Sequence, residues 1–390
     1  MLQNDADSIK HTVDVVVIGG GVIGLTIARA LALRGAGDIC LIERASLGRE
    51  ASFAAAGMLA PQAEANAPDD FFSLACRSRD LYANFAASLR DETGVDIELD
   101  RTGTLYLALT YHDLVDIEKR FHWQTAAGLP VEKLTAAQAR ELEPCISNNI
   151  VGALRFPLDV QLENRRLLSA LTNSVSKLGV SIVTETSVES VRVERDSVRG
   201  VQTSRGFINC AKVVVAAGTW SGFVQLSPKT VEKPALPALK VEPVRGQMIS
   251  FDARPQVTRH VIYSPRGYIV PRQDGRLLAG STSEYAGFAK QVTAGGISTI
   301  LANAQEISPA ISSLPIVDTW SGLRPRAPDN LPVLGPCDEI GGLFYATGHY
   351  RNGILLAPVT GELIAEAIVD GVVSPLLNPF SPGRFHLVRV

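Results

Sequence analysis

Hydrophobic residues near the start of the chain follow the pattern of a strand, a helix and a second strand. Residues 13–18 and 38–43 form short runs rich in aliphatic residues, typical of buried parallel strands. Residues 24–34 between them show helical spacing. A similar strand is expected at 212–217, after two alternating segments separated by turn glycines. The pattern predicts a βαβ unit within one nucleotide-binding domain.

The middle of the chain follows other patterns. The stretch "RTGTLYLAL" predicts a strand, "DLVDIEKRFHWQTAAGL" an amphipathic helix, and "TAAQARELEP" a helix that Pro144 ends. Residues 242–282 alternate apolar and polar positions with frequent turns, which is typical of antiparallel sheet. We therefore expect a doubly wound α/β domain interrupted by strand-rich insertions, and hence two interleaved domains.

Composition narrows the class of protein. With 390 residues, the chain is expected to form two domains or one elaborated α/β unit. Its formal net charge of -3, spread over interspersed charged residues, predicts no nucleic-acid partner. Its five cysteines are scattered and its six histidines form no cluster, which predicts reduced thiols and no metal site.

The apolar N-terminal run could be mistaken for a signal peptide or a membrane span. It contains four glycines within residues 19–24 and Arg29 inside it, and an acidic tail precedes it. We therefore predict a cytoplasmic protein without membrane attachment.

A dinucleotide-binding fingerprint stands at the expected place in the βαβ unit. Gly19, Gly21 and Gly24 form GxGxxG between the first strand and the helix, and Glu43 ends the second strand nineteen residues later. The glycines allow a tight turn, a close approach to a pyrophosphate and close helix packing, and the acid accepts hydrogen bonds from a ribose. This favours NAD or FAD over NADP and does not separate the first two. The small-residue stretch "LGREASFAAAGMLAP" that follows fits either an extended cofactor or a tightly packed helix.

Two basic positions are candidates for anion binding. The segment "TGHYRNGILLAPVTG" places Arg351 at the start of an apolar helix, where free N–H groups attract negative charge; the alternative is an ordinary surface cation. Arg324 precedes Pro325 in an extended segment. Its guanidinium could bind a carboxylate through two hydrogen bonds, or it could form a structural salt bridge. Arg326 serves as an internal control, expected to point away from the site.

Taken together, these residues resemble the D-amino-acid oxidase superfamily of FAD enzymes, and within it most closely the glycine oxidases of thiamine biosynthesis. The resemblance spans nearly the whole chain and rests on "VVVIGGGVIGLTIARAL", "ASFAAAGMLAPQAE", "VVVAAGTWSG", "YIVPRQDGRLLAG", "WSGLRPRAPDNLPVLG" and "ATGHYRNGILLAPVTGELI". It implies a glutathione-reductase-type FAD domain interleaved with a substrate domain built on an antiparallel sheet. The predicted FAD-binding parts are residues 1–90, 150–222 and 318–390, and the substrate-binding parts are residues 91–149 and 223–317.

The resemblance also implies roles for individual residues. Arg324 would hold the substrate carboxylate, Tyr268 would place a hydroxyl beside it, and Arg351 would be a second cation near substrate and flavin. From pattern alone, Tyr268 is better explained as a packed sheet aromatic. FAD would be bound noncovalently. Its implied contacts are Gly19, Gly21, Val22, Ile23, Gly24, Glu43, Arg44, Ala51, Ser52, Ala56, Gly57, Met58, Val188, Gly218, His349, Tyr350, Arg351, Asn352, Gly353, Ile354 and Leu355.

The implied reaction is oxidation of glycine or another small amino acid, with hydride transfer from Cα to flavin N5 and O2 as the final acceptor. Arg266 and Ser283 depart from the family pattern and could enlarge the pocket, which leaves sarcosine, N-alkylglycines and small D-amino acids open. Other possibilities are a FAD dehydrogenase with a quinone or protein acceptor, a FAD-binding subunit without turnover, and an NAD-linked dehydrogenase. A homo-oligomer is expected by resemblance.

Overall fold

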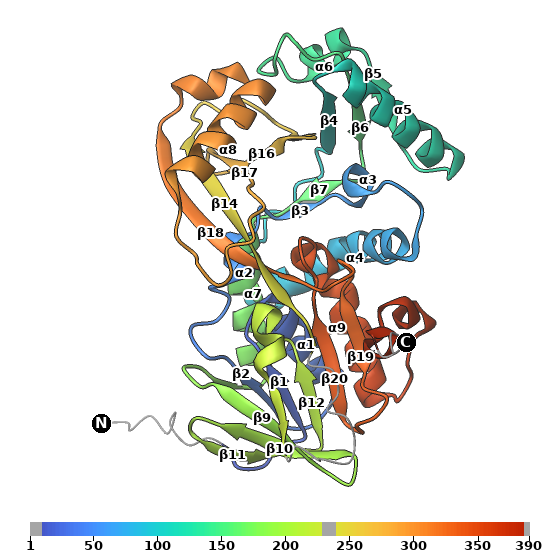
Figure 1. Ribbon diagram of the computed structural model, residues 1–390, viewed down its shortest axis with the longest axis vertical. Helices are drawn as coiled ribbons and strands as arrows, with labels where there is room; N and C mark the ends of the chain where they lie inside the picture. Colours follow the sequence, from blue (N-terminus) through green and yellow to red (C-terminus); the bar gives the residue numbers. More distant parts are fainter. Residues whose placement is uncertain (1–9, 228–238, 386–390) are drawn as a thin grey trace.

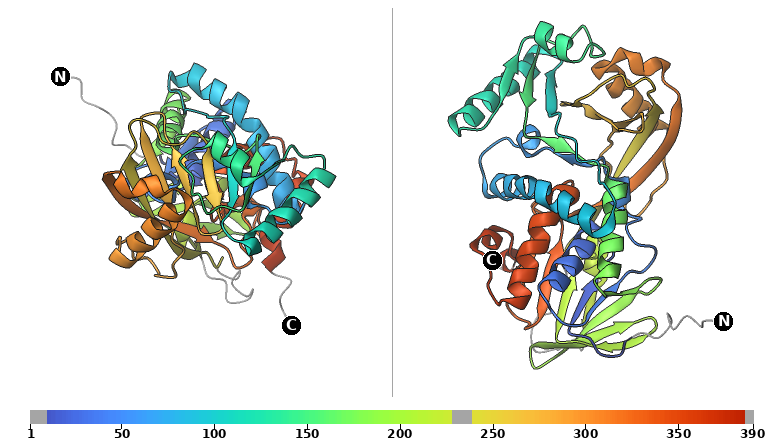
Figure 2. Two further views of the ribbon diagram at one scale, coloured as in Figure 1. Left: turned by 90° about the horizontal axis from the view of Figure 1, so that it is seen from above. Right: turned by 180° about the vertical axis from the view of Figure 1, so that it is seen from behind.

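The computed structural model describes residues 10–227 and 239–385 and has two lobes (Figure 1). A mainly parallel six-stranded sheet forms the core of one lobe, and an eight-stranded sheet forms the core of the other. Seen from behind, helix α4 (Asp70–Thr93, light blue) lies between the helices of the first lobe and the second lobe (Figure 2). None of the helices in the described part of the chain is long and apolar enough to cross a membrane.

The predicted βαβ unit is confirmed as the centre of the six-stranded sheet. Strands β1 (Val15–Ile18) and β2 (Ile39–Ile42) pair in parallel, and helix α1 (Val22–Leu33), which connects them, begins two residues before the predicted start. All neighbours in this sheet are parallel except β19 and β20. In order across the sheet, the strands are β19 (Val333–Pro336), β20 (Leu343–Thr347), β12 (Lys212–Val215), β1 (Val15–Ile18), β2 (Ile39–Ile42) and β8 (Ser181–Val183).

Alternate residues of β1 face two different cores. Val15 and Val17 pack in a cluster with the helices, whereas Val16 and Ile18 pack toward a small second sheet on the other face. Because both faces of a parallel strand are covered, its sequence is continuously apolar. The helices are α1 (Val22–Leu33), α4, α7 (Asn164–Lys177) and α9 (Gly353–Val369), and the small sheet holds β11 (Gly206–Asn209), β10 (Ser197–Thr203), β9 (Val188–Glu194) and β13 (Gln225–Ser227).

Helices α1 and α9 cross at close range because of one glycine. A Cβ atom on Gly361 would lie 2.7 Å from Cγ2 of Thr26 and 3.1 Å from the Thr26 carbonyl oxygen. The absence of a side chain there lets the two helices approach until their backbones nearly touch. This contact sets the position of the N-terminal end of α9 beside the N-terminal end of α1.

The eight-stranded sheet confirms the antiparallel sheet predicted in the middle of the chain. All its neighbours are antiparallel except β15 and β4. Its strands, in order, are β18 (Ile316–Arg326), β14 (Glu242–Asp252), β17 (Arg276–Gly280), β16 (Gly267–Pro271), β15 (Val261–Ser264), β4 (Thr104–Ala108), β6 (Gly152–Phe156) and β5 (Glu132–Leu134). Around it lie α5 (Tyr111–Ala126), α6 (Ala136–Leu142) and α8 (Ala294–Ile307), with the 3-10 helix η2 (Pro309–Ser313).

The two faces of this sheet pack against different parts of the molecule. On β16, Ile269 packs in the cluster that contains Ile300 of α8, whereas Tyr268 and Val270 point to the opposite side. That opposite side faces the first lobe. The period-two alternation of the strand thus places Tyr268 toward the space between the lobes.

The connection between the lobes contains several short elements. The small-residue stretch after β2 forms helix α2 (Ala51–Ala54) and strand β3 (Met58–Leu59), so the alternative of one tightly packed helix holds only for Ala51–Ala54. Helix α3 (Pro61–Glu64) follows β3 in the chain. Strand β7 (Val160–Gln161), which comes much later in the chain, pairs with β3. Further 3-10 helices are η1 (Gly218–Phe223), η3 (Pro375–Phe380) and η4 (Pro382–Phe385). Strand β6 falls within residues 150–222, which were predicted to bind FAD, yet it pairs within the eight-stranded sheet. The domain boundaries drawn from the sequence stay predictions.

Candidate functional site

An elongated cavity of about 380 Å³ lies where the two sheets face each other. It begins at the loop between β1 and α1, passes α2 and β3, and ends between β14, β16 and β18 and the start of α9. The structure brings nearly all predicted site residues together here. Those that line the cavity are Gly19, Gly21, Val22, Ile23, Glu43, Arg44, Ala51, Ser52, Ala56, Gly57, Met58, Val188, Gly218, Tyr268, Arg324, His349, Tyr350, Arg351, Asn352, Gly353 and Ile354.

Two predicted residues lie behind the cavity wall. A Cβ atom on Gly24 would stand 1.8 Å from the carbonyl oxygen of Gly19, so this glycine serves helix packing, as the fingerprint requires. The Leu355 side chain is buried in the core cluster, and its carbonyl oxygen accepts a hydrogen bond of 2.6 Å from Ser78. Leu355 therefore does not line the cavity, because the helix turns this side chain into the core, and its contact with the flavin stays a prediction.

The start of α1 has the features of a pyrophosphate site. Gly19 has φ +110°, and a Cβ atom there would lie 2.5 Å from the carbonyl oxygen of Ala216. Gly21 caps the helix without any side-chain hydrogen bond, and the N–H of Val22 donates to Oγ of Ser52 at 3.0 Å. The helix N-terminus therefore opens into the cavity with backbone donors and a partial positive charge.

Glu43 is held rigidly at the end of β2. Its carboxylate accepts hydrogen bonds from the backbone N–H groups of Gly20 at 2.8 Å and Ala45 at 2.9 Å. A carboxylate has about four acceptor positions, so two hydrogen bonds leave capacity for ribose hydroxyls. Beside it, the guanidinium of Arg44 lies 3.5 Å from the ring centre of Trp220 and pairs with Glu50 at 2.8 Å. Trp220 also lines the cavity; it lies in the motif "VVVAAGTWSG", but it was not predicted as a site residue.

We expect Glu43→Ala to weaken cofactor binding without unfolding the protein. The change removes the acceptor for two backbone N–H groups and any contact with a ribose, and each such loss costs about 1–3 kcal/mol. The dissociation constant of the cofactor, measured by titration of the apoprotein, should rise by about tenfold or more. The control Glu189→Ala removes an exposed carboxylate on β9 and should leave it unchanged. Equal affinities for the two variants would contradict the assignment.

The other end of the cavity is formed by the start of α9. The helix begins at Gly353, and Asn352 caps it without a side-chain hydrogen bond. Its free N–H groups face a cavity that could receive a negatively charged ring edge. His349 is buried there, with Nε2 3.1 Å from Oγ1 of Thr360, and burial lowers its pKa from 6.5 to about 3. The imidazole is therefore neutral at ordinary pH and is a positioning group instead of a cation.

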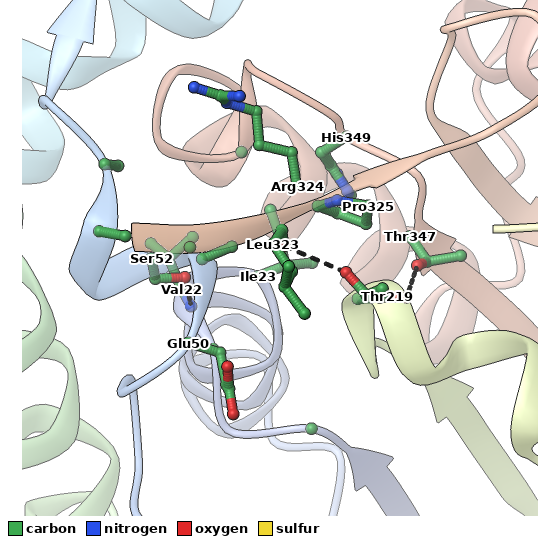
Figure 3. Close-up of a pocket in the computed structure, with 18 of the residues that line it drawn as sticks. Val22, Ile23, Glu50, Ser52, Thr219, Leu323, Arg324, Pro325, Thr347 and His349 are labelled. Atoms are coloured by element: carbon green, nitrogen blue, oxygen red, sulfur yellow. Dashed lines mark hydrogen bonds between the residues drawn. The ribbon is translucent and has the colours of Figure 1, made fainter. Parts of the chain in front are cut away.

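Strand β18 is joined to this helix start by backbone contacts. Arg326 and His349 form an isolated antiparallel bridge, and the N–H of Tyr350 donates to the carbonyl oxygen of Pro325 at 2.9 Å. Figure 3 shows Leu323, Arg324 and Pro325 passing over the cavity, with His349 next to Pro325. The motifs "WSGLRPRAPDNLPVLG" and "ATGHYRNGILLAPVTGELI" thus meet in one wall of the site.

Arg324 is the unpaired cation of the cavity. Its Nη1 donates to the carbonyl oxygen of Thr282 at 3.1 Å and its Nη2 donates to Oγ of Ser281 at 2.8 Å. Within residues 10–227 and 239–385, no carboxylate lies within salt-bridge distance of it. Burial lowers the pKa of this guanidinium, because desolvation disfavours its charge. Arg324 is half-buried, and a partly desolvated cation without an anionic partner is unfavourable unless a ligand supplies the anion.

A glycine in the neighbouring strand makes room for this side chain. A Cβ atom on Gly246 of β14 would lie 2.1 Å from Nη2 of Arg324. The guanidinium therefore lies flat against the strand backbone, with its orientation fixed by Ser281 and Thr282 on one edge. This leaves donor capacity for a planar two-oxygen group such as a carboxylate.

Tyr268 lies beside Arg324 in the cavity wall. Its hydroxyl is 3.3 Å from Sδ of Met248, and its ring centre is 5.7 Å from that of Tyr263. Tyr263 in turn stacks on Tyr106 at 5.7 Å. Tyr268 therefore packs in the sheet, as the pattern indicated, and it also lines the cavity; its hydroxyl donates to a thioether sulfur, which is only a weak acceptor. Its place beside a substrate carboxylate stays a prediction.

Arg351 differs from Arg324 because it already has partners. Its Nη2 lies 3.3 Å from Oε1 of Glu64 and donates to the hydroxyl of Tyr263 at 2.5 Å, and that hydroxyl donates to Glu64 at 3.1 Å. Attraction to Glu64 raises the pKa of Arg351. Glu64 and Tyr263 were missed as site residues. Glu64 could have been found at the end of the quoted motif "ASFAAAGMLAPQAE", whereas Tyr263 carries no local signal.

The residues that depart from the family pattern lie elsewhere. Arg266 is exposed and pairs with Glu306 of α8, and Ser283 is not among the lining residues, so the expectation that they border the pocket is wrong. Arg326 also stays outside the cavity, held by Asn330 at 2.6 Å and Glu242 at 3.5 Å. Residues two apart in a strand share a face, so these partners at the end of β18, and not strand alternation, turn Arg326 away from the position of Arg324.

The donor set fits an extended dinucleotide with a flavin at one end. A rigid acid and a helix N-terminus serve the nucleotide end, and a second helix N-terminus with a neutral histidine serves the ring end. Gly57 has φ +71° and lines the middle of the cavity, where side chains would obstruct an extended molecule. The described residues hold no group of three or more side chains suited to a metal ion.

Comparison with known proteins agrees with this geometry. The model of a family described as FAD dependent oxidoreductase (DAO) matches residues 14–367. The chain is 36% identical over 382 residues to the glycine oxidase of Geobacillus kaustophilus, covering 97% of this chain and 99% of that protein. It is also 36% identical to the bifunctional protein ThiO/ThiG of Synechocystis, covering 96% of this chain and 54% of that protein, so it spans about half the length of this relative.

A solved structure gives the same result in three dimensions. The crystal structure of glycine oxidase from Geobacillus kaustophilus superposes with a TM-score of 0.90 at 35% identity, covering 96% of this chain and 99% of that one. The match includes both lobes and therefore the walls of the cavity between them. The fingerprint, the cavity and these likenesses agree on the same cofactor. The chain therefore belongs to the FAD dependent oxidoreductase family, and FAD is its cofactor.

Proposed function

We propose that the protein oxidises glycine or another small primary or secondary amino acid, with O2 as the final electron acceptor. The observation that carries the proposal is Arg324, a half-buried guanidinium that lines the cavity without a carboxylate partner among the described residues. An amino acid supplies the missing anion. The relatives named glycine oxidase support the amine as the group to be oxidised.

The chain's residues have distinct tasks in this reaction. Arg324 binds the substrate carboxylate through its planar fork, and Tyr268 places its hydroxyl nearby, so that the substrate Cα–H is held in one orientation. The N–H groups at the start of α9 would hold the flavin ring and favour negative charge on its edge. Bound FAD supplies the redox chemistry by accepting a hydride from Cα and passing its electrons to oxygen.

The products follow from the electron balance. The amino acid loses two electrons and two protons to become an imino acid, and water hydrolyses the imine to an oxo acid and ammonia or an amine. Oxygen gains the two electrons and two protons as hydrogen peroxide. No protein base is required to remove the Cα proton, which is consistent with a neutral, buried His349.

The test is an anaerobic spectrum of the purified yellow protein before and after addition of glycine, sarcosine or D-alanine. We expect the flavin absorbance to bleach with at least one of these amines, and peroxide to form when air is admitted. Bleaching without peroxide would indicate a dehydrogenase with another acceptor. No bleaching with any of them would remove the proposed function and favour a FAD-binding subunit without turnover.

The choice among amines is a separate question. Arg266 and Ser283, which had suggested a larger pocket, do not line the cavity, so they no longer favour a substrate larger than glycine. Steady-state turnover over a panel of N-alkylglycines and small D-amino acids ranks the substrates. A place in thiamine biosynthesis, a cytoplasmic location and a homo-oligomeric state remain part of the proposal, supported by the names of the relatives, the unpaired cysteines and the family resemblance.

A further inference from the structure

The two arginines at the substrate end of the cavity are not equivalent in charge. Arg351 forms a closed triangle with Glu64 and Tyr263, in which each side chain contacts the other two. The Arg351 side chain is 39% exposed and the Glu64 side chain 26%, and both residues line the cavity. The pair is therefore a neutral unit that a ligand still reaches.

Arg324 has no such neutralising partner. Its described hydrogen bonds go to a carbonyl oxygen and a hydroxyl, which are uncharged acceptors. The remaining acidic lining residues, Glu43 and Glu50, serve the nucleotide end, and Figure 3 shows Glu50 on the opposite side of strand β18 from Arg324. This end of the cavity thus carries two positive charges and one negative charge, which leaves a single uncompensated cation.

The negative charge is fixed in place by the fold. Glu64 is the last residue of helix α3, and Asp159 accepts hydrogen bonds from the first turn of this helix. The Asp159 carboxylate accepts hydrogen bonds from the N–H groups of Gln62 at 3.2 Å and Ala63 at 2.7 Å, and it is fully buried. The helix that carries Glu64 therefore cannot swing away to admit a second anion beside Arg351 without breaking this buried cap.

We infer that Glu64 is a specificity-determining residue that restricts the substrate to one negative charge. This rests on the proposed function and narrows its substrate class to monocarboxylic amino acids with an uncharged substituent on nitrogen or Cα. A substrate with a second carboxylate would place it against Glu64 while Arg351 is already paired. Removing the Glu64 charge releases Arg351, and the pocket then offers cations for two carboxylates.

The experiment compares Glu64→Gln with the wild type on two substituted glycines. N-ethylglycine carries a neutral substituent, and iminodiacetate carries a carboxylate of similar reach. We expect the ratio of kcat/KM for iminodiacetate to that for N-ethylglycine to rise at least tenfold in the variant, whatever happens to the absolute rates. An unchanged ratio overturns the inference, because a merely structural or amine-binding role of Glu64 would affect both substrates alike.

Two matched controls isolate the charge. Glu64→Asp keeps the carboxylate, and Tyr263→Phe removes the hydroxyl that bridges Glu64 and Arg351 but keeps both charges. Both should retain the wild-type ratio. If either raises the ratio as much as Glu64→Gln does, geometry and not charge sets the specificity, and the inference fails.

A binding measurement separates this inference from the proposed function and does not depend on the variant's folding. Propionate and malonate differ by one carboxylate and are titrated against the holoenzyme by the change in flavin absorbance. In the wild type, malonate should bind at least tenfold more weakly than propionate. Equal affinity overturns the inference even if glycine is oxidised, and a wild type that discriminates the two but bleaches with no amine overturns the proposed function alone.

Discussion

Replacing Arg324 by alanine is expected to lower kcat/KM for the preferred amino acid by about 10²- to 10³-fold, because truncating one partner of a buried charge pair costs about 2–5 kcal/mol. The loss should be concentrated in KM and in the anaerobic rate of flavin reduction, since the substrate would no longer be held by its carboxylate. Bound FAD should remain, because the interactions that position Glu43 and the start of α1 are untouched. Stopped-flow reduction under anaerobic conditions measures this.

Two matched variants make the result specific to the guanidinium fork. Arg324→Lys retains the positive charge but not the planar pair of donors, and should recover only part of the activity. Arg326→Ala removes a neighbouring arginine that pairs with Asn330 and Glu242 outside the cavity, and should remain close to wild type. An Arg324→Ala enzyme with undiminished turnover would remove the basis of the proposed function.

Replacing Gly57 by alanine is expected to displace the cofactor. Gly57 has φ +71°, which costs an L-residue about 1–2 kcal/mol, and its new Cβ would stand 2.1 Å from the carbonyl oxygen of Leu162. Because the obstacle is backbone, the segment from Ala56 to Met58 must move, and this segment lines the cavity. The fraction of purified protein that carries FAD should fall severalfold, and the dissociation constant of FAD should rise by about tenfold or more.

The chain offers a close control for this prediction. Gly35 has the same φ of +71°, but a Cβ atom there would meet nothing within 4 Å, and it lies at the exposed end of α1. Gly35→Ala should therefore cost only the backbone strain, seen as a slightly lower melting temperature with a full complement of FAD. If both variants lose FAD equally, general destabilisation explains the effect, and the close contact with Leu162 is not its cause.

The features that could be predicted from the sequence are those made by neighbouring residues. The strand, glycine turn, helix and acid of the nucleotide site all lie within residues 13–43, where apolar periodicity and glycine spacing act directly on the local backbone. The alternation of β16 likewise placed Tyr268 and Ile269 on opposite faces. The substrate-site roles of Arg324 and Tyr268 came from the family resemblance and not from these patterns.

Some expectations went wrong because local pattern says nothing about distant neighbours. Arg266 was expected near the pocket, yet Glu306 of α8 holds it on the outside. For the small-residue stretch at 47–61, a packed helix and a cofactor-lining segment were both left open. The stretch lines the cavity, and only Ala51–Ala54 is helical, because β3 pairs with β7 about a hundred residues away. The pairing of β3 with β7 therefore determined the structure of a segment whose local sequence fitted more than one structure.

By itself, the sequence determined that the chain forms a dinucleotide-binding βαβ unit and an antiparallel sheet, because both depend on side-chain periodicity along single elements. Only the tertiary structure decided which arginine is free. Arg351 meets Glu64, which is 287 positions away, and Tyr263, which is 88 positions away, whereas Arg324 meets no acid in the described chain. The reason is physical: a charge is neutralised by whatever the folded chain brings within a few ångströms, and that distance is a property of the fold and not of spacing along the sequence.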